Sequence, residues 1–156
     1  MATKVEDRDV ATINVQQVRR LYEECLNPGR LELISELLAE DFVGSRGERG
    51  PDGFAHSVKA LRAAFSDLHF EIEEVFGDAQ RVSARWLMTG RHTGNFAGVA
   101  PTGNAVRQAG IVVYAMRDGR LLRAWMQSDR LALYQQIGLV GELPPGFALP
   151  AAVTTT

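Results

Sequence analysis

The spacing of apolar residues changes between residues 65 and 70, and this change constrains the fold more than any other feature of the chain. Before it, apolar residues recur every three or four positions, as on the buried face of a helix. After it, they alternate with polar residues, as on a half-buried strand. Helices followed by antiparallel strands predict an α+β fold in which the helices cover one face of a sheet.

Three helices are expected before the change. Apolar residues keep a helical interval over residues 14–26, and the Asn-Pro-Gly sequence at 27–29 ends that helix. A short second helix is expected over residues 31–38. After a glycine-rich loop, Pro51 opens the third helix, whose apolar face ends at Phe65.

Four strands and a closing helix are expected after the change. The clearest strand covers residues 81–93, with Trp86 and His92 on one face and arginines on the other. The Asp-Gly pair at 118–119, between two apolar runs, predicts a hairpin. The expected segments are strands over 69–76, 81–93, 106–116 and 121–128 and a helix over 130–137.

The chain has 156 residues, the usual size of one domain, and no internal repeat. We therefore expect a single domain over residues 1–156, with a folded core at about 12–140. The polar segment 1–11 is expected to be a flexible lead-in. The tail 142–156, which is rich in proline and threonine, is expected to be flexible as well.

Charge and cysteine content exclude several classes of function. A net charge of −2 offers no basic patch for nucleic acid. The N-terminus is polar, unlike a signal peptide, and no apolar run approaches the roughly 18 residues of a membrane span. We therefore expect a cytoplasmic protein that binds neither nucleic acid nor membranes. Cys25 falls at helical spacing with apolar residues, so we expect it to pack in the core.

Several ordered motifs resemble a known family. They are Glu40-Asp41-Phe42, the segment 64–67, the run GRHTGNFAGVAPTGNAV at 90–106, Asp118-Gly119 and the segment QQIG at 135–138. Over most of residues 14–140 the chain is similar to the SnoaL-like polyketide cyclases of the nuclear transport factor 2-like superfamily. The resemblance implies a cone-shaped α+β barrel: three N-terminal helices packed on a strongly curved, mainly antiparallel sheet, then a short C-terminal helix.

The resemblance also implies a chemistry and an assembly. The best-known activity of the family is an intramolecular aldol ring closure of an aromatic polyketide ester, with no metal and no organic cofactor. Members of the family frequently form oligomers through the sheet, so we expect a homodimer or a homotetramer.

The resemblance places an acid/base aspartate just after the last strand, a few residues beyond a tryptophan. Here that aspartate is Asp129, which follows Trp125. By alternation Asp129 shares a face with Trp125 and Gln127, so we expect an aromatic wall to desolvate its carboxylate. The alternative is that Asp129 caps the final helix. His92 is expected to point inward and polarise a carbonyl group or steady the carboxylate, or else to be structural.

The predicted substrate-binding residues are Trp86, Phe96, Gln108, Tyr114, Trp125 and Gln127. The aromatic members would form flat walls for an aromatic substrate, because pockets of this kind are mostly apolar with few polar groups. The alternative for each aromatic residue is packing in the core, which is also our assignment for Tyr22. The Gly-rich run at 90–106 joins two strands rather than a strand and a helix, so it is interpreted as a hairpin over the pocket and not a phosphate loop.

One departure from the family leaves the reaction open. Some cyclases carry a histidine shortly after the early Asp-Phe motif, whereas the sequence here continues from Phe42 as Val-Gly-Ser. Epoxide opening by the same type of site, and non-catalytic binding of a small molecule, are therefore kept as alternatives. A contribution to hydroxylation together with a partner enzyme is a minor third alternative.

Overall fold

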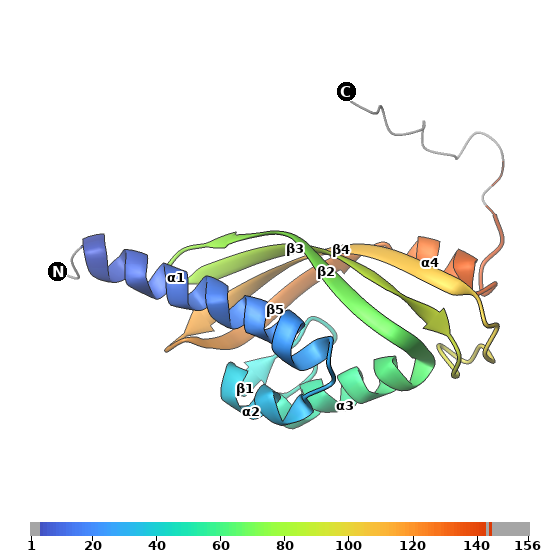
Figure 1. Ribbon diagram of the computed structural model, residues 1–156, viewed down its shortest axis with the longest axis horizontal. Helices are drawn as coiled ribbons and strands as arrows, with labels where there is room; N and C mark the ends of the chain where they lie inside the picture. Colours follow the sequence, from blue (N-terminus) through green and yellow to red (C-terminus); the bar gives the residue numbers. More distant parts are fainter. Residues whose placement is uncertain (1–3, 143, 145–156) are drawn as a thin grey trace.

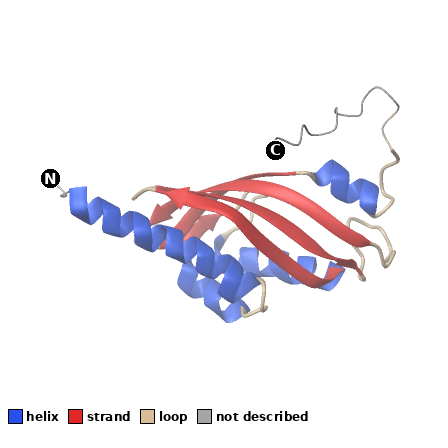
Figure 2. Cartoon of the chain, turned by 45° about the horizontal axis from the view of Figure 1, so that its top comes forward, coloured by secondary structure: helices blue, strands red, loops and turns tan. Residues whose placement is uncertain are grey.

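The computed structural model of the chain describes residues 4–142 and 144. A single sheet of long, curved strands forms one layer (Figure 2). Its strands lie in the spatial order β1-β5-β4-β3-β2, and all pairs are antiparallel except β1 with β5. The strands are β1 (Leu38–Val43), β2 (Phe65–Gly77), β3 (Arg81–His92), β4 (Ala105–Arg117) and β5 (Arg120–Ser128).

Three helical regions precede most of the sheet and lie on one side of it, as Figure 1 shows for α1, α2 and α3. α1 continues without a break into a π-helical turn, and a 3₁₀ turn leads into α2. A fourth helix follows β5. The helical elements are α1 (Lys4–Arg20), η1 (Leu21–Leu26), η2 (Leu31–Leu33), α2 (Ile34–Leu37), α3 (Gly50–Ala64) and α4 (Arg130–Gln136).

The predicted α+β class, the three N-terminal helices, the four strands and the short closing helix are confirmed. The predicted hairpin at 118–119 is confirmed too, and both residues have positive φ, as a two-residue turn between twisted strands requires. The sheet is strongly curved but does not close into a barrel, because β1 and β2 are its two edges.

Two segments differ from the expectation. The expected lead-in over 1–11 is helical from Lys4 onward. Spacing did not predict this helix because its first turns bury no apolar stripe; Val5, for example, is 66% exposed. β1 was missed because its burial does not alternate and its register against β5 shifts between Leu38 and Val43. The expected flexible tail lies outside the described residues, apart from residues 142 and 144.

The core lies between the helices and the concave face of the sheet. β3 buries alternate residues from Val82 to Met88, as predicted, and these belong to one buried apolar cluster with residues of α1, η1 and α2. Asn27, just after η1, clamps the helices to β2. Its side-chain amide donates to the Phe70 carbonyl at 2.9 Å and accepts from the Phe70 N–H at 2.7 Å. This exchange fixes the end of η1 to the edge strand β2.

The thiol of Cys25 provides a test of this packing. Cys25 is fully buried, as predicted, and burial is the main cause that raises its pKa to about 11. At pH 8 the native thiolate fraction is then on the order of one in a thousand. We expect a thiol reagent to label Cys25 at least about 100-fold more slowly in native protein than in urea. Equal rates, measured by mass spectrometry, would contradict the packing of η1.

Candidate active site

Two adjoining cavities lie between the helices and the concave face of the sheet. The first encloses about 780 Å³ of empty space, open solvent at its mouth included, and the second about 460 Å³. Most of the lining is aliphatic or aromatic. The residues that line both cavities are Arg46, Leu61, Phe70, Trp86 and Met126.

The structure brings four of the predicted binding residues to these cavities. Trp86 lines both, Tyr114 lines the first, and Phe96 and Gln108 line the second. Gln108 is buried, and its amide donates to the Ser128 hydroxyl at 3.3 Å. β3 and β4 pair antiparallel, and every second residue of each strand points inward. Trp86, Gln108 and Tyr114 occupy such inward positions on the two strands and therefore line neighbouring parts of the cavities.

Trp125 and Gln127 lie elsewhere, contrary to the expectation. Both are exposed on the outer face of the sheet, where the Arg123 guanidinium lies 5.1 Å from the Trp125 ring centre. On β5 the inward positions belong to Ala124 and Met126, which line the first cavity. Alternation correctly placed Trp125 and Gln127 on one face, but the choice of face was wrong.

Asp129 is exposed and lies at the N-terminus of α4, where its carboxylate accepts a hydrogen bond from the Ala132 N–H at 3.0 Å. The capping interpretation is therefore confirmed. Its neighbours Ser128 and Arg130 line the second cavity, but Asp129 belongs to the lining of neither cavity. The expected aromatic wall beside this carboxylate is not formed by Trp125, which is itself exposed.

His92 points inward, as expected, and is fully buried, but it too is outside the lining of both cavities. Its Nδ1 accepts from the Thr102 N–H at 3.3 Å and lies 3.0 Å from the Thr102 hydroxyl. The ring also packs on Phe65. Since Nδ1 accepts, the proton of the neutral ring is on Nε2, which has no partner within the described part of the chain. His92 thus holds the β3–β4 loop in place.

The loop between β1 and α3 supplies polar groups that sequence reasoning missed. Arg46 lines both cavities and Glu48 the first, and Glu48 accepts the Arg46 backbone N–H at 2.9 Å. Partial burial and the neighbouring Arg130 lower the pKa of the Arg46 guanidinium, whereas Glu48 and Tyr134 oppose that change. An irregular loop has no periodicity, so no pattern in the sequence indicated that these side chains face the cavity.

Among the described residues, Glu48 is the one carboxylate in the lining of either cavity. It is half-buried and packs over Gly44, where a side chain would collide with the carboxylate. The absence of a side chain at Gly44 therefore makes room for Glu48.

Tyr22 was assigned to the core, and it is indeed buried, but it also lines the first cavity. Its hydroxyl lies 2.6 Å from that of Tyr114. Burial raises the pKa of both phenols well above the ordinary value. Both therefore stay protonated at neutral pH and act as neutral hydrogen-bonding groups.

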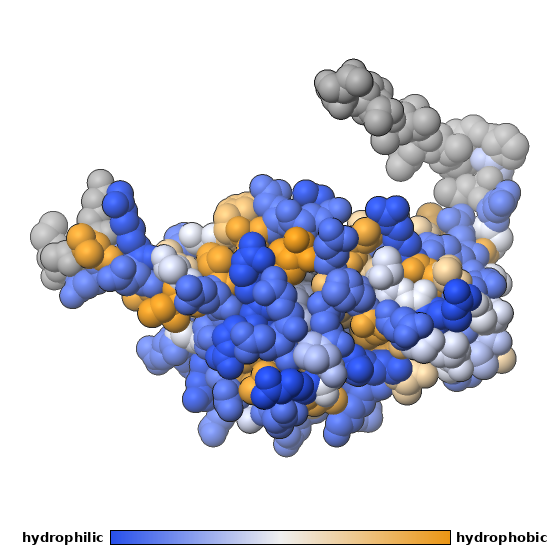
Figure 3. Space-filling view, viewed as in Figure 1, coloured by the Kyte–Doolittle hydropathy of each residue, from blue (hydrophilic) through white to orange (hydrophobic). Residues whose placement is uncertain are grey.

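Residues 4–142 contain no group of three or more His, Cys, Asp or Glu side chains placed to hold a metal ion. None of the helices in the described part of the chain is long and apolar enough to cross a membrane. On the face seen in Figure 3, hydrophilic side chains predominate and apolar ones form small separate groups.

The helices enclose an apolar cavity against a curved, open sheet. This arrangement defines the cone-like class of α+β folds that the sequence predicted. The SnoaL-like polyketide cyclase family matches residues 16–137. The chain belongs to this family.

Two curated relatives and one solved structure narrow the class of enzyme to which the chain is similar. The chain is 34% identical to the aklanonic acid methyl ester cyclase DnrD of Streptomyces peucetius over 130 residues, 81% of each chain. It is 32% identical to the aklanonic acid methyl ester cyclase AcmA of Streptomyces galilaeus, covering 76% of this chain and 74% of that one. The structure of a SnoaL-like polyketide cyclase from Agrobacterium tumefaciens matches with a TM-score of 0.69 at 22% identity, covering 80% and 98%. The predicted enzyme class, a polyketide cyclase, is confirmed by these relatives.

Proposed function

We propose that the protein closes a ring in an aromatic polyketide keto ester by an intramolecular aldol reaction, with no metal and no organic cofactor. The observation that carries this proposal is the mostly apolar double cavity in a chain whose curated relatives act on aklanonic acid methyl ester. Substrates of this class are flat and aromatic, and the shared wall of Phe70 and Trp86 suits such a shape.

The reaction needs one proton acceptor. A base removes a proton from a carbon that lies between carbonyl groups, and the resulting carbanion attacks a second carbonyl carbon of the same molecule. The alkoxide formed then takes the proton back, so substrate and product have the same mass and no redox partner is needed. A carboxylate beside the cavity can act as that base and then as the acid.

Glu48 is the candidate base that the lining of the cavity favours, because its carboxylate borders the first cavity. Asp129, the residue implied by the family resemblance, is the competing candidate. Its carboxylate is engaged at the N-terminus of α4 and borders neither cavity. The cytoplasmic location and the homodimer or homotetramer stay predictions.

The test is to incubate purified protein, without added cofactor, with a panel of aromatic polyketide keto esters and epoxides and to analyse the products by mass spectrometry. We expect a new retention time with unchanged mass from at least one keto ester. A gain of water would identify epoxide hydrolysis instead. Tight binding of a panel member without any product would favour a binding module and contradict the cyclase proposal.

A further inference from the structure

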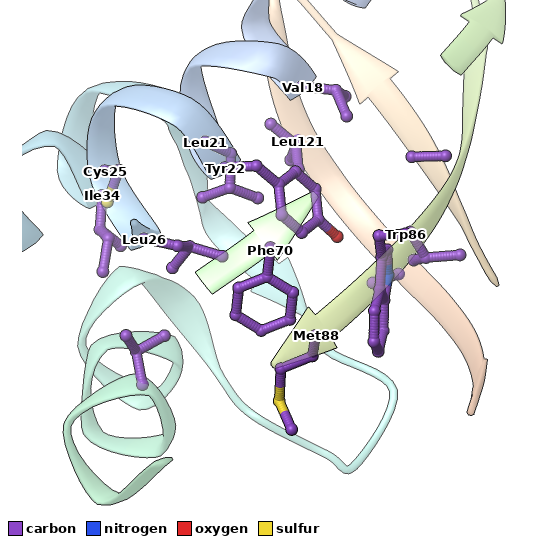
Figure 4. Packing of buried hydrophobic residues seen from close by; sticks show 14 of the residues in the cluster. Val18, Leu21, Tyr22, Cys25, Leu26, Ile34, Phe70, Trp86, Met88 and Leu121 are labelled. Carbon is purple, nitrogen blue, oxygen red and sulfur yellow. The ribbon is translucent and has the colours of Figure 1, made fainter. Parts of the chain in front are cut away.

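Three buried side chains with polar tips line the first cavity. Tyr22 comes from the π-helical turn η1, Trp86 from β3 and Tyr114 from β4. They are 3%, 3% and 5% exposed, and all three line the first cavity. Figure 4 shows the Tyr22 hydroxyl directed toward the Trp86 indole, with Phe70 beside both. Three elements distant in the sequence thus bring their polar atoms to one place.

One phenol O–H of this group has no acceptor within the group. The two phenol hydroxyls share one hydrogen bond at 2.6 Å, so the hydroxyl that accepts it still has its own O–H to donate. The Trp86 Nε1–H is buried beside the Tyr22 hydroxyl, with which it interacts, but among the described residues it has no partner at full hydrogen-bond geometry. A buried donor without an acceptor is unfavourable, and native proteins contain few of them. The cluster therefore lacks an acceptor atom.

We propose that Tyr22, Tyr114 and Trp86 form a donor site that holds one carbonyl oxygen of the substrate and stabilises that oxygen as it becomes an enolate. The inference rests on the proposed function, because it names which substrate group this cavity recognises. A carbonyl oxygen has two lone pairs and no proton, so it can accept from both the free phenol O–H and the indole N–H.

The electrostatics of the cluster suit an oxygen that gains negative charge. Burial keeps both phenols neutral, because it raises their pKa well above the ordinary value. They can then donate hydrogen bonds without carrying a charge of their own. Fixed, buried donors stabilise a developing oxyanion more strongly than water does, because they are already oriented toward it. The same groups bind the neutral ketone more weakly, which is the condition for catalysis.

Two features of the backbone position the members of the cluster. Gly110 lies opposite Trp86 in the β3–β4 pairing, and a side chain at this position would overlap the indole ring. Tyr22 lies in a π-helical turn, a rare conformation that often occurs at functional sites. The glycine admits the indole and the π-helical turn presents the phenol, so both features bring donors to this cavity.

The test measures binding and needs no turnover. The probes are anthraquinone-2-sulfonate, which has two ring carbonyls, and anthracene-2-sulfonate, which has the same ring shape and charge but none. We expect the protein to bind the quinone about tenfold more tightly by calorimetry. This preference should disappear in the Tyr22→Phe/Tyr114→Phe double variant and decrease in Trp86→Phe. Affinity for the anthracene should change less than about twofold in the tyrosine variant, since the apolar wall is retained.

The double variant removes both hydroxyls at once, so no buried hydroxyl is left without its partner. Thr89→Val, which removes a hydroxyl group from an exposed position of β3 outside the lining of both cavities, is the control and should keep the quinone preference. A preference that persists in the tyrosine double variant, or that is absent from the wild-type protein, would overturn the inference. If the quinone preference depends on the tyrosines but the protein cyclises no keto ester, the donor site is supported and the proposed function is contradicted.

Discussion

Glu48→Gln is expected to lower kcat for ring closure about 100-fold, and Asp129→Asn to change it less than about threefold. Loss of a positioned general base typically lowers the rate by a factor on the order of 10² to 10⁴. Glu48 borders the first cavity, whereas Asp129 is exposed at the start of α4. The difference between the two variants therefore identifies which carboxylate moves the proton.

Both substitutions preserve the local structure, which makes the comparison clean. A glutamine at 48 keeps an oxygen to accept the Arg46 N–H, and an asparagine at 129 caps a helix about as well as aspartate. Rates would be measured with saturating keto ester, and thermal unfolding would check that both variants remain folded. Loss of turnover in Asp129→Asn, with Glu48→Gln unaffected, would assign the base to the residue that the family resemblance implied.

The strands and their inward residues could be predicted because burial on one face leaves a period of two in the sequence. This rule correctly predicted that Trp86 and His92 point inward and that β4 follows β3 antiparallel. It could not choose the face of β5, because 122–128 contains apolar residues on both sides of the strand. The choice is made by pairing with β4, whose register against β5 shifts between Ala115 and Met116.

The polar residues of the site could be predicted less well, for a different reason. Glu48 reaches the cavity from an irregular loop, where side-chain direction depends on the fold of the backbone and not on spacing. Tyr22 has the helical spacing of a core residue, and it is one. Its hydroxyl meets Tyr114 only because η1 packs over β4, a contact across 92 positions of sequence that no local pattern contains.

Gly110→Ala is expected to lower the free energy of unfolding by about 3 kcal/mol, the upper part of the range for overpacking a core. A methyl group at this position would overlap the Trp86 ring, which is 3% exposed and packs edge-on against Phe70. Gly110 does not have a positive φ, so alanine fits its backbone and, by itself, would be neutral or slightly stabilising. The whole cost therefore comes from displacement of the indole.

A double-mutant cycle with Trp86→Leu measures how much of the cost of Gly110→Ala comes from displacement of the indole. A leucine at 86 leaves room for the methyl group and keeps an apolar side chain in the core. Urea denaturation should give a cost of about 3 kcal/mol for Gly110→Ala in the wild-type background and less than about 0.5 kcal/mol in the Trp86→Leu background. Gly110→Ala should also decrease the preference for the quinone probe, since the indole N–H moves away from the phenols. An equal cost in both backgrounds would show that Gly110 serves the backbone of β4 and not the position of Trp86.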